Sequence, residues 1–157
     1  MKKLKEWVRR IAGRGTVICC NIAEGVHGDG CITKLTDAAL ATRNVLVKIG
    51  SDISHVAVTT AGTEIPLGVV NDEASAAEEY VNVQLLGAKQ GTVLMVASAP
   101  ITAGDLLQAA ASGKVATLGT GGNGTYYIVG RALNAAAADG DLVEVAHCVP
   151  VQRVVSS

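Results

Sequence analysis

The sequence predicts an all-β fold, a compact β-sandwich or barrel of two related β units preceded by a short basic amphipathic helix. Three observations lead to this prediction. From residue 16 onward, short apolar and β-branched runs alternate with Gly, Asn and Asp, and no long helical pattern separates them. Two stretches of the chain repeat one another 62 positions apart. With 49% hydrophobic but only 3% aromatic residues among 157, the core must consist of small aliphatic side chains.

The N-terminal helix is predicted over residues 2–12, and two glycines end its pattern just beyond. Its apolar residues follow the i, i+3, i+4, i+7 spacing of one helical face: Leu4, Trp7, Val8 and Ile11. An isolated helix this short is marginal in water, so we expect it to be ordered by packing on its own body or on a partner. The domain organisation that follows is a basic arm over residues 1–15 and a β-rich body over residues 16–157.

Charge divides the chain at nearly the same place. Residues 1–14 hold six bases and one acid, a net +5, whereas residues 15–157 hold seven bases and thirteen acids, a net −6. A basic arm can dock on an acidic surface. The acidic body lacks the many bases that neutralise phosphates, so we expect no direct nucleic-acid binding. No apolar stretch approaches the roughly 20 residues of a membrane span, and charges interrupt any signal peptide, so we expect no membrane partner and synthesis in the cytoplasm.

The body is predicted to contain many short strands at regular spacing. Their expected ranges are Thr16–Ala23, Gly30–Leu35, Val45–Ile49, His55–Val58, Ile65–Asn71, Tyr80–Leu86, Thr92–Ala97, Leu106–Ala109, Val115–Thr117, Tyr126–Leu133 and Leu142–Cys148, with Val149–Val155 as a last edge strand. Two alanine-rich pieces, Ala74–Glu79 and Asn134–Ala138, are expected to form helical turns. The glycine-rich segment Gly119–Gly124 lacks the features of a phosphate loop and is interpreted as a hairpin tip.

The internal repeat covers about residues 42–86 and 103–148. Its strongest part places two strand segments in the same order: Leu67-Gly68-Val69 and Tyr80-Val81-Asn82-Val83 match Val129-Gly130-Arg131 and Leu142-Val143-Glu144-Val145. Because the valines keep their phase, the same strand face should be buried in both halves. We interpret the repeat as two related β units in one compact body, with chance similarity in an Ala-, Gly- and Val-rich chain as the alternative.

No residue set supports catalysis. The sequence contains no Gly-x-Ser-x-Gly elbow and no His-Glu-x-x-His motif. The cysteines form no CxxC pair and are interpreted as free thiols: Cys19, Cys20, Cys31 and Cys148. The three histidines are scattered along the chain, at His27, His55 and His147, and the acids around residues 72–79 are interpreted as a solvated turn. The sequence therefore predicts no enzyme, no metal site and no cofactor.

The second half carries a pattern of small residues and turns. It consists of Ala103-Gly104-Asp105-Leu106-Leu107, Ala111-Ser112-Gly113-Lys114-Val115, Val129-Gly130-Arg131-Ala132-Leu133 and Ala136-Ala137-Ala138-Asp139-Gly140-Asp141-Leu142-Val143-Glu144-Val145. This pattern resembles the capsid cement, or decoration, proteins of tailed bacteriophages. The resemblance covers residues 92–148 well and residues 42–86 loosely, and the basic helix lies outside it.

The resemblance implies a structural protein, often trimeric, that binds the outer surface of a phage major-capsid shell and stabilises it against internal DNA pressure. Its expected partners are the major capsid protein and other copies of itself, most simply as a homotrimer. On this hypothesis the partner-contacting residues lie in the arm, with an apolar anchor among bases that steer association: Lys2, Lys3, Lys5, Trp7, Arg9 and Arg10.

Three other functions remain open from the sequence. Gly104-Asp105 also resembles a turn of biotinyl or lipoyl carrier barrels, although no lysine has the Met-Lys setting of their modified residue. A thiol-dependent enzyme would need an activated cysteine near His27. A phage head fibre or similar appendage is the third alternative.

Overall fold

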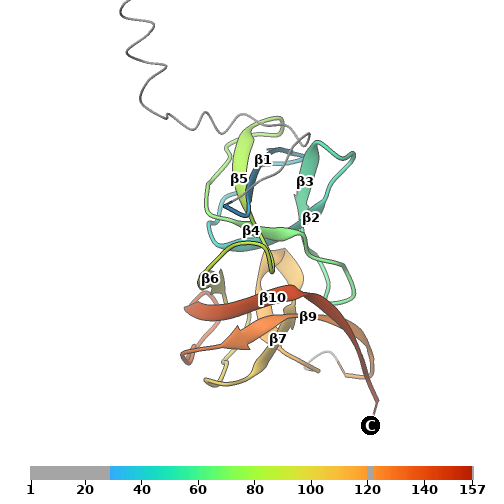
Figure 1. Cartoon of the computed structure of the whole chain (residues 1–157), viewed down its shortest axis with the longest axis vertical. Coiled ribbons are helices and arrows are strands. Elements are labelled where there is room, and N and C mark those ends of the chain that lie inside the picture. The colour runs from blue at the N-terminus through green and yellow to red at the C-terminus, as the bar shows by residue number, and fades with distance from the viewer. Residues whose placement is uncertain (1–28, 120–121, 157) are drawn as a thin grey trace, which may run out of the picture.

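A computed structural model describes residues 29–119 and 122–156 of the chain (Figure 1). These residues form ten strands and one 3₁₀ turn, so the predicted all-β fold is confirmed. The strands are β1 (Cys31–Thr36), β2 (Val45–Ile49), β3 (His55–Val58), β4 (Gly68–Val70), β5 (Tyr80–Leu85), β6 (Val93–Val96), β7 (Leu106–Ala109), β8 (Val115–Thr117), β9 (Gly124–Ala132) and β10 (Leu142–Val155), with the turn η1 at Ala111–Gly113. The predicted helix and the predicted strand Thr16–Ala23 lie outside the described residues, and the division at residues 15 and 16 stays a prediction.

The first five strands close into a barrel in the order β1-β3-β2-β4-β5. All neighbours pair antiparallel except β1 and β3, which pair in parallel through Leu35–His55 and Thr36–Val56. Strand alternation directs every second side chain inward. The hydrophobic cluster of the barrel is formed by Leu40, Val47, Val56, Val70, Ala74, Val81 and Val83. Two polar residues of β1, Lys34 and Thr36, are also buried.

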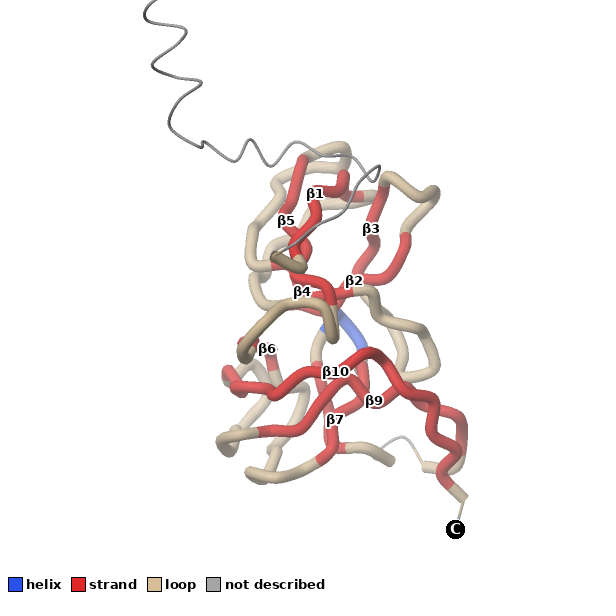
Figure 2. The backbone as a smooth tube through the Cα atoms, viewed as in Figure 1, coloured by secondary structure: helices blue, strands red, loops and turns tan. Residues whose placement is uncertain are grey.

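Each neighbouring pair of barrel strands recurs in the second five strands with both numbers raised by five, although β6 and β8 are joined by a single bridge only. Their sheet runs β6-β10-β9-β7-β8. A single parallel bridge, Ala97–Val115, links β6 to β8 where β1 and β3 pair in the barrel. Figure 2 shows the two units one above the other along the long axis of the molecule. The chain is therefore built from two related β units of the same strand order.

The interior of the second unit contains a counterpart for each barrel-core residue. In the same order along the chain these are Ile101, Leu107, Val115, Ala132, Ala136, Val143 and Val145, and all are buried. The prediction that the valines of β5 and β10 are buried in both halves is confirmed.

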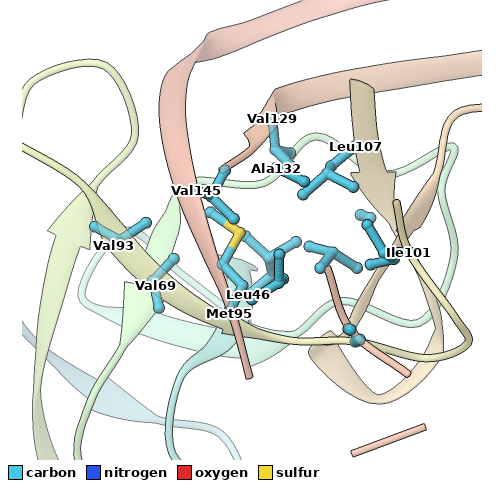
Figure 3. Packing of buried hydrophobic residues seen from close by; sticks show 14 of the residues in the cluster. Leu46, Val69, Val93, Met95, Ile101, Leu107, Val129, Ala132 and Val145 are labelled. Atoms are coloured by element: carbon cyan, nitrogen blue, oxygen red, sulfur yellow. The ribbon is translucent and has the colours of Figure 1, made fainter. Parts of the chain in front are cut away.

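The two units share this second core. Leu46 and Val69 lie opposite each other on β2 and β4, point out of the barrel, and are fully buried among the second-unit residues (Figure 3). Backbone hydrogen bonds cross the same seam, from Val96 N–H to the Asn44 carbonyl at 3.2 Å and from Gly113 N–H to the Thr59 carbonyl at 2.8 Å. The barrel thus completes the core of the second sheet, and the described residues form one body.

Three local predictions are wrong. The alanine-rich pieces form no helix, because Ala74 and Ala136 are used as single β-bridges to Leu40 and Ile101. The segment between β8 and β9 is no hairpin tip, since β7 lies between those two strands. The last two predicted strands are one strand, β10, whose register against β9 shifts between His147 and Val151.

Candidate functional site

The residues predicted to contact a partner cannot be placed. Lys2, Lys3, Lys5, Trp7, Arg9 and Arg10 lie outside the described residues, as do Cys19, Cys20 and His27. The arm hypothesis is therefore carried forward as a prediction. The described residues contain other candidate sites.

The two described cysteines lack the environment of a reactive thiol. Both are free and half-buried. The Cys31 Sγ lies 3.9 Å from the Asp29 carbonyl, and the Cys148 Sγ lies 3.8 Å from the Ile128 carbonyl. Burial raises the pKa of the Cys148 thiol, which lowers its thiolate fraction at neutral pH. No group of three or more His, Cys, Asp or Glu side chains within residues 29–119 and 122–156 is arranged to hold a metal ion.

His55 forms a clasp between two carboxylates at the start of β3. Its Nδ1 lies 2.7 Å from Asp52 Oδ1, and its Nε2 lies 3.2 Å from both carboxylate oxygens of Glu78. The hydrogen bond to Asp52, followed by that to Glu78, raises the pKa of His55. Sequence reasoning missed this cluster, because Glu78 is 23 residues away from His55 along the chain. The clasp ties two loops together and uses both ring nitrogens for that purpose.

The acidic residues of the loop between β4 and β5 hold the loop in place. Asp72 accepts a hydrogen bond from Asn82 N–H at 2.7 Å, Glu73 pairs with Arg43 at 3.0 Å, and Glu79 accepts from Ser75 N–H at 2.9 Å. These carboxylates make separate structural contacts. Paired-carboxylate catalysis instead needs two such groups facing one substrate position.

Two of the described lysines are engaged in ion pairs. Lys48 pairs with Glu64, and Lys114 pairs with Asp139 at 2.6 Å. Burial acts to raise the pKa of Glu64, but hydrogen bonds from Lys48 and Thr60 outweigh it and lower that pKa to about 2. A carrier domain needs its modified lysine free at a turn, and these two ammonium groups are held by carboxylates.

An apolar cavity of about 510 Å³ opens beside the barrel. Its lining includes Leu40, Val45 and Val58, and its one carboxylate, Asp37, already accepts hydrogen bonds from the N–H and hydroxyl of Ser51 at 2.7 Å. The cavity is large enough for apolar side chains of a partner. It offers no pair of groups suited to acid–base or nucleophilic chemistry.

Several exposed leucines lie on the second sheet, on the face away from the shared core. Four leucines occupy it, each between 38% and 48% exposed: Leu94, Leu106, Leu133 and Leu142. The register places them on one face of the sheet, with Glu144 and Arg131 between them. Leu94 on β6 lies opposite Glu144 on β10, and Glu144 is two residues after Leu142 on the same strand. Leu133 N–H donates to the Glu144 carbonyl. Leu106 on β7 lies opposite Arg131 on β9. We call these four residues the leucine face.

The leucine face corresponds to a surface that is covered in the first unit. The Leu106–Arg131 pair of the second unit occupies the same place in the strand order as Leu46–Val69, which the second sheet buries completely. No described segment covers the leucine face. Contiguous exposed apolar patches commonly mark interaction sites. Together, these features define an all-β protein with exposed leucines on one sheet face.

Comparison with known families agrees with that class. A family model described as phage cement protein matches residues 26–147, and the chain belongs to this family. It is therefore a phage capsid structural protein. No curated protein matches the chain.

The fold is also found in a solved structure, that of the head fiber gp8.5 N base in bacteriophage phi29. The likeness has a TM-score of 0.55 at 20% sequence identity, and it covers 80% of this chain and 92% of that one. At this identity the likeness shows a common fold. Among the described residues, none of the helices is long and apolar enough to cross a lipid bilayer.

Proposed function

We propose that the chain is a cement, or decoration, protein that binds the outer surface of a phage major-capsid shell and stabilises the shell against internal DNA pressure. It catalyses no reaction in this role. Membership of the phage cement family supports the proposal, and the observation that carries it is the leucine face. A protein that acts by adhesion needs exposed apolar surface in place of a reactive centre.

Copies of the chain associate through the leucine face, as a homotrimer. Arg131 and Glu144 lie among the leucines, so the face carries both signs of charge. A surface of that kind suits contact with an identical copy, because charges of one copy can meet opposite charges of the next. Each subunit then needs only weak contacts with the shell, since a trimer engages several lattice positions at once.

The basic arm provides the shell contact in this proposal. Lys2, Lys3, Lys5, Arg9 and Arg10 steer the subunit towards acidic capsid surface, and Trp7 is the apolar anchor. Two full-length variants separate these roles in binding to undecorated shells. Trp7→Ala should weaken binding at every salt concentration, whereas Arg9→Gln with Arg10→Gln should mainly reduce its salt dependence. Unchanged occupancy and salt dependence in both variants would remove the arm from the mechanism.

The leucine face is tested by self-association in solution. Leu94→Lys and Leu142→Lys place bases beside Glu144, so the variant should fold while losing its apolar contact. The control is Ile53→Lys, which changes a 72% exposed residue next to the barrel. Sedimentation velocity over a concentration series should show smaller species for the leucine variant alone. Equal association of both variants would exclude the face as the contact between copies.

A second candidate function is the base of a head fibre. It is favoured by the fold likeness to the phi29 head fiber base, which covers nearly all of that chain. Electron microscopy of virions carrying the chain separates the two functions. A fibre base would appear beneath projecting fibres, whereas a cement protein would appear as short knobs repeated over the shell.

A further inference from the structure

The last residues of β10 and the first residues of β9 form a two-stranded ribbon at one end of the second sheet. Residues 151–155 pair with residues 124–128, and Figure 1 shows the end of β10 running away from the barrel towards the C-terminus. The loop between β3 and β4 covers the β9 edge of this ribbon. Tyr127 N–H donates to the Gly62 carbonyl at 3.3 Å, and a side chain at Gly62 would lie 2.9 Å from Tyr126 Cδ1. The ribbon is therefore held on the body along one of its two edges.

The other edge of the ribbon, on β10, is open. Strand β6 borders β10 only as far as Val145. A turn then covers the next residues: Gly87 N–H donates to His147 Nδ1 at 2.9 Å, and a side chain at Gly87 would lie 2.5 Å from the Val149 nitrogen. From residue 150 onward, no strand of the described part of the chain pairs on this side of β10. Residues 150–154 therefore present a free strand edge.

The free edge carries little protection against pairing. Val151 and Val154 are 54% and 64% exposed, and Gln152 and Arg153 between them are also exposed. Natural proteins blunt a free edge with charges, prolines, bulges or a covering segment, whereas residues 151–154 contain one charge and no proline. A row of unpaired backbone groups beside apolar side chains accepts a further strand. The edge therefore fits a partner that presents an extended, largely uncharged segment.

We propose that this partner is the same edge of a second copy, paired antiparallel about a two-fold axis that passes between the two Gln152 residues. A two-fold axis between identical antiparallel strands places one residue directly opposite its own copy, and the neighbouring pairs follow outward from it. The second copy is favoured over a foreign strand because the edge complements itself when Gln152 is the central residue.

The two residues next to Gln152 are unsuited to the centre. With Arg153 there, two guanidinium groups would lie directly opposite each other, which destabilises a strand pair. With Val151 there, residues 153–155 of the second copy would meet residues 147–149, where the turn at Gly87 already lies.

Gln152 at the centre leaves no such conflict. Each Gln152 amide faces its copy and offers both a donor and an acceptor. Val151 then lies opposite Arg153 of the second copy, whose apolar stem can cover it, and Pro150 lies opposite Val154. A centre at Val154 would instead leave Val151 outside the ladder. Pairing about Gln152 is therefore the register that uses both exposed valines.

The pairing also fits the placement of the two bodies. Because each body covers the β9 edge of its own ribbon, the bodies lie on opposite sides of the joined strands, which run in the order β9-β10-β10-β9. The ladder uses residues 150–154 of each chain, so it is weak for a single pair and gains strength where many copies are repeated. These residues are distinct from the leucine face, so the edge adds a second kind of contact between copies.

A disulfide trap on the full-length protein tests the register. Gln152→Cys places two thiols directly opposite each other, with Cα atoms about 4.5–5.5 Å apart, within disulfide range. Brief oxidation in air with copper phenanthroline should therefore give an interchain disulfide between the two copies of residue 152. A non-reducing gel measures the crosslinked fraction, and peptide mass mapping distinguishes this bond from those of the four native cysteines.

Val151→Cys is the matched control, at an exposed position on the same edge. In the proposed register its two copies are diagonal neighbours about 7–8 Å apart, which is beyond disulfide range. Gln152→Cys should give roughly five times more bond between equivalent residues, or a larger excess still. Equal trapping at the two positions overturns the proposal. A bond from residue 152 to a native cysteine as the main product also overturns it, because another segment then occupies the edge.

The same trap in the variant Leu94→Lys with Leu142→Lys separates this contact from the proposed trimer. The disulfide of Gln152→Cys should persist there, since the edge and the leucine face are different surfaces. Loss of the disulfide in that variant overturns the proposal, because the crosslink would then depend on the leucine face. The experiment uses purified protein without shells, so its outcome is distinct from that of the capsid-binding proposal.

Discussion

Replacing Gly113 with alanine tests whether the two β units are packed tightly against each other. Gly113 ends η1 with φ +69°, and a Cβ added there would lie 2.8 Å from both Val45 Cβ and Val58 Cγ1. It would also lie 2.9 Å from the Leu46 carbonyl oxygen. Its neighbours belong to β2 and β3, so the added methyl group would enter the seam between the units.

The expected loss in the free energy of unfolding of Gly113→Ala has two parts. A left-handed backbone conformation costs a non-glycine residue about 1–2 kcal/mol. Overpacking a seam formed by backbone and β-branched side chains adds about 1–3 kcal/mol. Gly113→Ala should therefore lower the free energy of unfolding by about 2–5 kcal/mol.

Gly140→Ala is the matched control. Gly140 has φ +90° and nothing within 4 Å of an added Cβ, so only the backbone part, about 1–2 kcal/mol, should be lost there. Urea unfolding followed by far-UV circular dichroism measures both variants. Equal losses of unfolding free energy at the two positions would refute the tight seam, because the overpacking cost at Gly113 would then be zero.

Three further predictions concern the core and the titrating groups. Leu46→Ala should lower the free energy of unfolding by about 2–5 kcal/mol, against less than about 0.5 for the exposed Ile53→Ala, in the same urea assay. The stability advantage of wild type over His55→Asn should be full below pH 6.5 and lost as pH rises through the raised pKa of His55. An advantage that grows from pH 5 to 9 would contradict the clasp. Glu64→Gln should lower the free energy of unfolding by about 1.5–3 kcal/mol at pH 7. This difference from wild type should vanish as pH falls from 4.5 towards 2, and urea unfolding of both proteins at a series of acid pH values measures it.

Strand positions were predictable because they depend on local pattern. β2, β3, β7 and β8 occupy the predicted ranges, since each is a short apolar run between turn residues. The prediction of a helical turn at Ala74–Glu79 is wrong because the β-bridge between Ala74 and Leu40 outweighs the helix propensity of alanine. β10 is one strand where two were predicted, Leu142–Cys148 and Val149–Val155, and its register against β9 shifts near that division, between His147 and Val151.

The candidate surface was predictable in kind but not in place. The resemblance to cement proteins already implied contact between copies of the chain. Which residues are exposed depends on register: Leu106 is 38% exposed, whereas its neighbour Leu107 is fully buried. The strand register and the His55–Glu78 contact both depend on residues that are far apart along the chain. Neither is encoded in a local pattern.

In the proposed function, the chain stabilises a phage shell by binding to it. The most direct measurement is the temperature at which filled, undecorated particles release their DNA, followed by dye fluorescence as purified protein is added to saturation. If the bound chain stabilises the shell, the release temperature should rise and reach a plateau at a fixed number of copies per particle. An unchanged release temperature at saturating protein, or the absence of binding to the particles, would contradict it.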